Sequence, residues 1–163
     1  MKKGLVFIIL LCFVFTAKAQ FKIGVNGGVP VGDYSDFYKF NVGVDAYYMF
    51  RDPDKFFNLG AATGFINFFG DEVDVLGTTV EYDNAQFIPV AAAARFTLFS
   101  LLTFGPDIGY GISLNEGMDG GFYWRSVLGL DFGNRLEIDT FYQSISVDGT
   151  TLGSIGAGLL IEF

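Results

Sequence analysis

The chain has 163 residues, enough for one domain, and it is 51% hydrophobic and 18% aromatic with a formal net charge of −8. An acidic chain of this kind lacks the basic surface that nucleic-acid binding requires, and a chain without histidine cannot use a histidine base to activate a nucleophile. After residue 20 no apolar run reaches the ~20 residues of a membrane-spanning helix.

Residues 1–19 have the layout of a secretory signal peptide. Lys2 and Lys3 form a positive region, residues 5–15 are apolar, and the Ala-Lys-Ala stretch at 17–19 is a small-x-small cleavage site. An N-terminal anchor helix is the alternative, but the apolar stretch is short for one. We therefore expect residues 1–19 to be cleaved.

The mature chain, residues 20–163, forms one expected domain without cysteine. Cleavage removes Cys12, the only cysteine, and three of the ten basic residues, so the formal charge becomes −11 (7 − 18). Export without cysteine suggests a bacterial envelope rather than a disulfide-stapled secreted domain.

Apolar residues alternate with small or polar ones in about eight segments, which is the period-two pattern of β-strands. In the clearest of them, Val42, Val44 and Ala46 alternate with Gly43 and Asp45. The segments cover residues 21–26, 41–50, 57–65, 87–96, 104–112, 122–132, 136–143 and 154–163.

The connections between these segments alternate in length. Short turns are expected at 51–54, 97–100 and 133–135, and mostly longer, polar loops at 29–39, 69–83, 115–121 and 147–150. Short turns at one end and longer loops at the other are typical of outer-membrane barrels, with both chain termini on the periplasmic side.

The two faces of the predicted strands differ in a way that separates a membrane barrel from a soluble sandwich. The apolar face carries aromatic residues near strand ends, as in an interfacial girdle: Tyr48, Phe50, Phe96, Phe104, Phe132 and Phe163. The other face mixes glycine with charges of both signs, which suits a lumen that about eight strands leave just wide enough for side chains. The charged residues expected there are Lys22, Asp45, Arg95, Asp107, Arg125, Asp131, Glu137, Asp139 and Glu162.

We expect these lumen charges to form a structural network, because an unpaired buried charge costs several kcal/mol. A proton or ion path is the alternative interpretation. Glu137 and Asp139 share one face and could act as acid and base, but structural pairing with Arg125 is the favoured interpretation.

Several short motifs resemble one known family. They are NGGVPVGDY at 26–34, FIPV at 87–90, GPDIGYG at 105–111 and the terminal Phe163. Together they resemble the small outer-membrane β-barrel domain family of Gram-negative envelopes, over essentially the whole mature chain. The resemblance implies an all-β fold, a closed antiparallel up-and-down transmembrane β-barrel of about eight strands that is porin-like and lies in the cell outer membrane.

The resemblance also implies insertion by the outer-membrane assembly machinery, which reads a C-terminal strand that ends in an aromatic residue. Here that insertion signal would consist of Leu159, Ile161 and Phe163. The family has no shared catalytic residues, so none is assigned and no cofactor is expected.

The loop at 69–83 contains acidic residues that suggest a weak cation site. Asp71, Glu72 and Asp74 supply the oxygen ligands that Ca²⁺ or Mg²⁺ prefers. Their spacing does not match an EF-hand, and a solvated loop is the favoured interpretation.

Three functions remain. The favoured one is an integral outer-membrane barrel that contacts membrane lipid, has a structural, adhesive or binding role through its extracellular loops, and binds a ligand that the sequence does not name. A soluble periplasmic or secreted β-barrel that carries an apolar ligand is the alternative. A membrane-embedded hydrolase comes third, because the chain has no histidine.

Overall fold

The computed structural model describes residues 20–33, 35–50, 56–75, 78–133, 135–147 and 149–163. The predicted signal peptide and the predicted turn at 51–54 lie outside this part of the chain. Among the described residues, no helix has the length and apolar character needed to cross a membrane.

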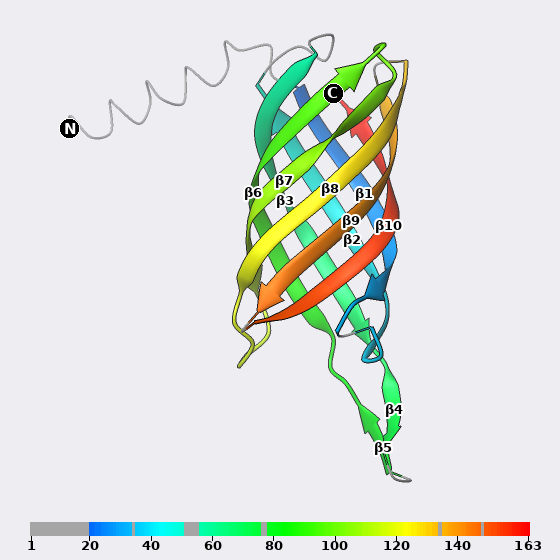
Figure 1. Ribbon diagram of the computed structural model, residues 1–163, viewed down its shortest axis with the longest axis vertical. Helices are drawn as coiled ribbons and strands as arrows, with labels where there is room; N and C mark the ends of the chain where they lie inside the picture. Colours follow the sequence, from blue (N-terminus) through cyan, green and yellow to red (C-terminus); the bar gives the residue numbers. More distant parts are fainter. Residues whose placement is uncertain (1–19, 34, 51–55, 76–77, 134, 148) are drawn as a thin grey trace, which may run out of the picture.

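Eight strands close into one antiparallel barrel, which confirms the predicted up-and-down fold (Figure 1). They are β1 (Gln20–Val31), β2 (Tyr38–Met49), β3 (Phe57–Gly70), β6 (Ala85–Leu98), β7 (Leu102–Ser113), β8 (Gly121–Phe132), β9 (Leu136–Val147) and β10 (Thr150–Glu162). Neighbours in sequence are neighbours in the barrel, and β1 pairs with β10 from Lys22–Glu162 to Val31–Gly153. Closure leaves no barrel strand with an unpaired edge.

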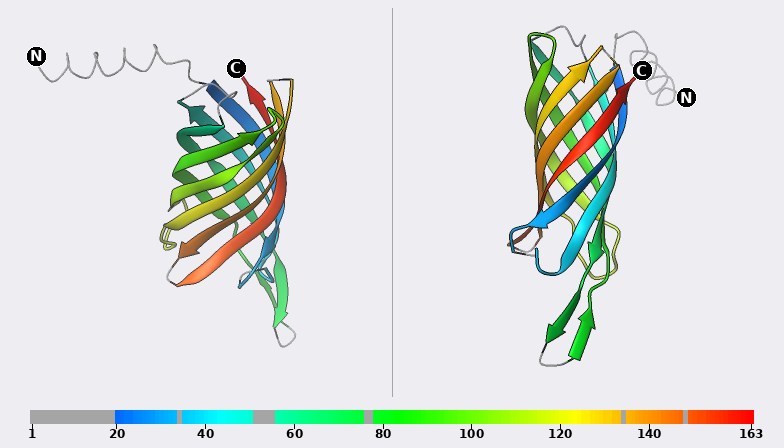
Figure 2. Two further views of the ribbon diagram at one scale, coloured as in Figure 1. Left: turned by 45° about the horizontal axis from the view of Figure 1, so that its top comes forward. Right: turned by 90° about the vertical axis from the view of Figure 1, so that its right-hand side faces the viewer.

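The barrel has two different ends, which Figure 2 shows from two sides. At the turn end, β6 joins β7, β8 joins β9, and both Gln20 and Phe163 are found. At the loop end lie the connections at 32–37, 71–84, 114–120 and 148–149. This is the alternation of connections that the sequence predicts.

One predicted loop is wrong in detail, because the segment at 69–83 contains a hairpin. β4 (Glu72–Val75) pairs antiparallel with β5 (Thr78–Glu81), and Figure 1 shows this hairpin projecting beyond the loop end of the barrel. Each strand has four residues, too few for a period-two pattern to distinguish it from a polar loop.

Three prolines lie within barrel strands, where each removes a backbone donor. Pro30 is the residue before the last one of β1, whereas Pro89 and Pro106 interrupt the pairing of β6 and β7 with their neighbours. The pairing of β3 with β6 skips from Thr63–Val90 to Ile66–Phe87, and the Thr63 hydroxyl donates to the carbonyl oxygen of Pro89 at 2.9 Å. The pairing of β6 with β7 is likewise interrupted around Pro106. There Arg95 Nη1 donates to the carbonyl oxygens of Ala94 and Pro106 at 3.0 and 3.3 Å, so a lumen side chain replaces the missing backbone donor.

The lumen has two chemically different halves. Toward the turn end its side chains are mostly charged, as the sequence predicts, whereas toward the loop end they are mostly apolar, with the buried Asn41 opposite Phe68. Phe68 and Phe87 are fully buried there and their rings meet edge to face at 6.4 Å. The rest of this apolar layer consists of Tyr38, Ile66, Ala85, Tyr123, Ile145 and Leu152.

Candidate functional site

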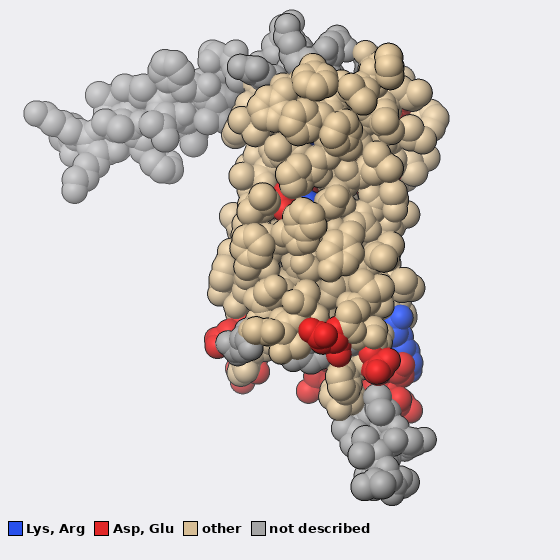
Figure 3. Space-filling view, in the orientation of Figure 1, with Lys and Arg blue, Asp and Glu red and all other residues tan. Residues whose placement is uncertain are grey.

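The outer face of the barrel is apolar and exposed. Val25, Val90 and Leu128, from three different strands, are 60%, 54% and 50% exposed, whereas the inward residues that alternate with them are mostly buried. In the view of Figure 3 the middle of the barrel is almost free of charge, and acidic side chains gather at the loop end. The charged part of the barrel wall therefore faces inward.

Aromatic side chains collect on the outer face at the turn end. Phe96 packs against Phe56, Phe57 and Phe104 with ring centroids 5.7, 5.0 and 5.4 Å apart. Phe99, at the tip of the turn between β6 and β7, is 94% exposed. This is the arrangement of an interfacial aromatic girdle.

The first group of lumen charges surrounds Lys22 near the turn end. Its ammonium nitrogen lies 2.8 Å from a carboxylate oxygen of Glu137, 3.3 Å from Glu162 and 3.8 Å from Asp131. The Thr103 hydroxyl donates to Asp131 at 2.5 Å. Glu137 therefore pairs with Lys22 and not with Arg125, so that part of the predicted pairing is wrong.

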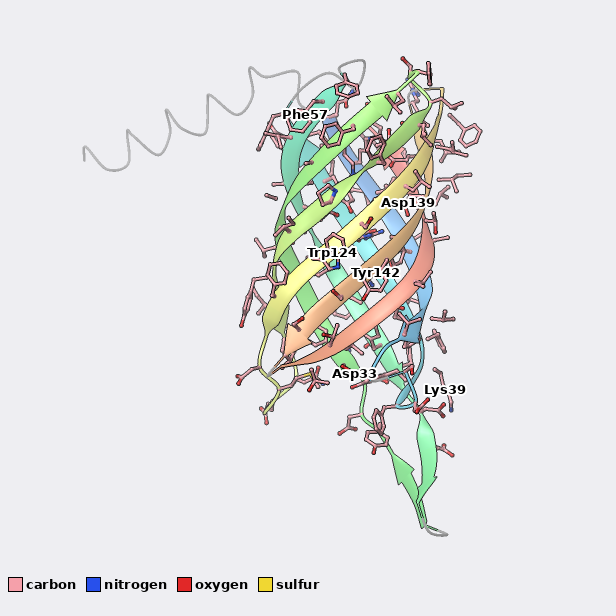
Figure 4. All side chains as sticks on the ribbon, in the orientation of Figure 1. Asp33, Lys39, Phe57, Trp124, Asp139 and Tyr142 are labelled. Atoms are coloured by element: carbon pink, nitrogen blue, oxygen red, sulfur yellow. The ribbon has the colours of Figure 1, made fainter. Side chains whose placement is uncertain are left out.

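The second group surrounds Arg95 and the third surrounds Arg125. Arg95 binds Asp107 at 2.6 Å, and the same carboxylate accepts the Tyr47 hydroxyl at 2.9 Å. Arg125 lies 2.9 Å from Asp45 and 3.7 Å from Asp139, and its guanidinium carbon sits 4.0 Å from the ring centroid of Phe141. Asp139, which is labelled in Figure 4, is buried in the barrel.

All nine predicted lumen residues thus belong to ion pairs, with three cations facing six carboxyl groups. The excess of carboxyl groups makes neutral donors necessary. Tyr47, Thr103 and Asn26 supply them, with Asn26 donating to Asp45 at 2.8 Å. The period of their strands places all three on the inward face, but none of them belongs to the predicted set of lumen charges because they are neutral.

The space left inside the charged half is small. A cavity of about 30 Å³, the size of one water molecule, lies among Lys22, Tyr47, Arg95, Asp131 and Glu137. The charged half of the lumen therefore has no room for an organic ligand.

The loop end holds a larger cavity at the barrel mouth. Its volume is about 230 Å³, and it is lined by Tyr38, Phe87, Gly117, Met118, Asp119, Val147, Thr150 and Leu152. Tyr38, Phe87 and Leu152 belong to the buried apolar layer of the lumen, and Met118 and Val147 pack against it. This site could not be predicted from the sequence, because its walls come from five separate segments.

The acidic segment after β3 does not form a metal cluster within the described part of the chain. Asp71 pairs with Lys39 at 3.1 Å and accepts the backbone N–H of Glu72 at 2.6 Å. The Lys39 hydrogen bond is the main reason that the pKa of Asp71 lies below its usual value. Asp74 lies on β4 opposite Thr79, and its side chain lies outside the described residues.

The three residues of the predicted insertion signal lie along the outer face of β10. Leu159 and Ile161 are 41% and 48% exposed, and Phe163 is 77% exposed. The Phe163 N–H donates to the carbonyl oxygen of Phe21 at 2.9 Å, so the last residue is tied to β1.

No protein-family model and no curated protein matches the chain. Among solved structures it is similar to Ail, the attachment invasion locus protein of Yersinia pestis, in a phospholipid bilayer nanodisc, with a TM-score of 0.57 at 14% identity over 87% of this chain and 99% of that one. A crystal structure of Ail gives 0.56 at 15% identity, covering 90% and 99%, and another holds Ail with the heparin analogue sucrose octasulfate. The outer membrane enzyme PagL gives 0.53 at 12% identity, covering 86% and 98%.

These likenesses and the closed topology define a class of protein. The chain has the fold of the small eight-stranded outer-membrane β-barrels. That fold includes both Ail and an enzyme, so the function must be argued from this chain's own surface and lumen.

Proposed function

We propose that this chain is an integral outer-membrane β-barrel that binds an external partner through its loop end. The observation that carries the proposal is the inverted barrel wall, which exposes apolar side chains outward and holds ion pairs inward. Such a wall is stable in lipid, where apolar contact is favourable and closed strands satisfy every backbone group. In water the same wall would leave a continuous apolar surface exposed.

The alternative of a soluble carrier has less support. A carrier needs an apolar interior that accommodates its ligand, and the charged half of this lumen has only a water-sized cavity. We propose instead that ion pairs and the apolar layer together plug the lumen. A catalytic role is not proposed, since the carboxyl groups of the lumen are engaged by Lys22, Arg95 and Arg125.

The charge of the loop end limits the choice of partner. The four loop-end connections contain ten acidic residues and no lysine or arginine. Ail binds a heparin analogue, which is a polyanion. The loop end of the present chain would repel a polyanion, so we propose a partner that is cationic or neutral.

Export and insertion complete the proposal. Residues 1–19 act as a cleaved signal peptide, and the terminal segment with Leu159, Ile161 and Phe163 is read by the assembly machinery. Mass spectrometry of the protein purified from envelopes should give a chain that begins at Gln20.

Deletion of Phe163 should reduce the amount of folded barrel in the outer membrane, while unchanged amounts would contradict the insertion signal.

Trp124, the one tryptophan of the chain, gives a direct test of the membrane location. It lies on the outer face of β8 with its ring 6.3 Å from that of Tyr142, and Figure 4 shows both residues on the barrel wall. Brominated phospholipid should quench its fluorescence in reconstituted vesicles, and the envelope fraction should contain a gel band that shifts on boiling. A soluble periplasmic protein without a heat shift would overturn the proposal.

A further inference from the structure

The cavity at the barrel mouth has the size and the walls of a small-molecule site. Its volume of about 230 Å³ exceeds the ~150 Å³ of an apolar cavity that binds benzene. Phe87 and Leu152, both in the buried apolar layer, lie at its lining, and Val147 and Met118 add further apolar surface. An aromatic ring or a short alkyl group would bury its surface there.

The site is held in place before any ligand binds. Asn115, in the loop that carries Met118, accepts the Gln86 N–H at 2.7 Å and donates to the Asn84 carbonyl at 2.7 Å. The loop is thereby tied to the segment at the start of β6. Gly117 has a φ of +80°, the left-handed region that glycine favours, and the chain reverses there next to Met118. A flexible methionine beside a cavity adapts to ligands of different shape.

The opening of the site is polar and negative. Asp119 is exposed at the lining, Thr150 adds a hydroxyl, and the surrounding loop end is acidic, as Figure 3 shows. A site with an apolar floor and a carboxylate at its mouth selects a molecule with an apolar end and a positive end. The acidic field around it also raises the local concentration of cations.

We propose that the mouth cavity binds a small organic cation that carries an aromatic or short alkyl group. The apolar group enters toward Phe87 and Leu152, and the ammonium or guanidinium group stays near Asp119. This inference rests on the proposed function only for the side of the membrane from which the ligand enters. The cavity opens to the outside of the cell if the loop end of the barrel lies outside.

The methionines of the chain provide a sensor for this site. Residues 20–163 contain Met118, which lines the cavity, and Met49, which is buried near the other end of the barrel. We would label both methyl groups with ¹³C in the detergent-solubilised full barrel and titrate phenethylammonium as the probe. We expect a saturable shift of the Met118 methyl signal, with a Kd of about 1 mM, and an unmoved Met49 signal.

Three matched comparisons test the chemistry of the site. Asp119→Asn should weaken phenethylammonium binding about two- to fivefold, whereas Asp33→Asn, an acidic loop-end residue outside the cavity lining, should leave it unchanged. Val147→Phe should fill the cavity and abolish the shift. The neutral 2-phenylethanol should bind more weakly than the cation, and 3-phenylpropionate weakest of all.

Two results would overturn the proposal. An unmoved Met118 signal in a barrel that still shifts on boiling would show that the cavity takes no such ligand. Equal binding of the anion would show that the site does not select cations. Neither result bears on membrane location, which the Trp124 quenching and the heat shift test separately.

Discussion

Arg125 is fully buried and holds two carboxylates, those of Asp45 and Asp139, within 2.9 and 3.7 Å. Arg125→Met removes the positive charge but keeps a long side chain in the lumen. Both carboxylates then remain buried without the guanidinium group. We expect the free energy of unfolding to fall by about 3–5 kcal/mol, the cost of breaking a buried pair. Urea titration of the barrel in phospholipid vesicles, followed by Trp124 fluorescence, measures it.

Lys39→Met is the matched control for that prediction. Lys39 pairs with Asp71 at 3.1 Å, but it is exposed at the loop end, as Figure 4 shows. Exposed pairs contribute about 0–1 kcal/mol, so little change is expected. A loss with Arg125→Met no larger than with Lys39→Met would show that the lumen pairs do not hold the barrel together.

The lumen residues could be predicted from the sequence, but most of their pairs could not. A period of two assigns each strand residue to one face, which is why Lys22 and Glu137 were both expected inside. Their contact could not be predicted in this way, because Lys22 lies on β1 and Glu137 on β9, with β10 between the two strands. Strand tilt and register decide which inward residues lie at the same level along the barrel axis. Neither can be predicted from the alternation of apolar and polar residues in a single strand.

The turn between β6 and β7 has a strained backbone. Phe99 and Ser100 have φ of +56° and +52°, and the Leu101 N–H donates to the Leu98 carbonyl at 3.1 Å, as in a type I′ turn. Such turns favour Asn-Gly, and each non-glycine residue in the left-handed region costs roughly 1–2 kcal/mol. An exposed aromatic at this tip therefore indicates an anchoring role in the membrane interface.

A double substitution separates the two roles of this turn. Phe99→Asn with Ser100→Gly should raise the free energy of unfolding in detergent by about 1 kcal/mol or more, because the turn relaxes. The same variant should insert more slowly into phospholipid vesicles, because the aromatic anchor is lost. Faster or unchanged insertion, measured by the heat-shifted band over time, would remove the anchoring role.

The outward apolar row of β10 runs from Ile155 to Phe163, and Leu159 lies at its centre. Leu159→Arg should therefore cost about 2–4 kcal/mol in vesicles, the value for arginine at the bilayer midplane. Thr151→Arg, on the same strand near the loop end, should cost about 0–1 kcal/mol. Equal costs at the two positions would show that no depth gradient, and so no bilayer, surrounds this face.

For the whole molecule, a plugged lumen would require its two halves to act as successive barriers. An ion that enters from the turn end meets pairs already closed between Lys22 and Glu137 and between Arg95 and Asp107. An ion from the loop end meets the apolar layer around Phe68 and Phe87, which offers few polar groups to replace its hydration shell. The two barriers differ in chemistry, so loss of one leaves the other intact.

This arrangement predicts an electrically closed barrel. In planar bilayers the reconstituted protein should show no discrete conductance steps, and Phe87→Ala should stay closed as well, since it widens the apolar layer without touching the ion pairs. A variant that opens on Phe87→Ala alone would show that the charged half is permeable and that the apolar layer is the real gate. Steps in the unmodified protein would contradict a plugged lumen and restore the ion path as the function of the network.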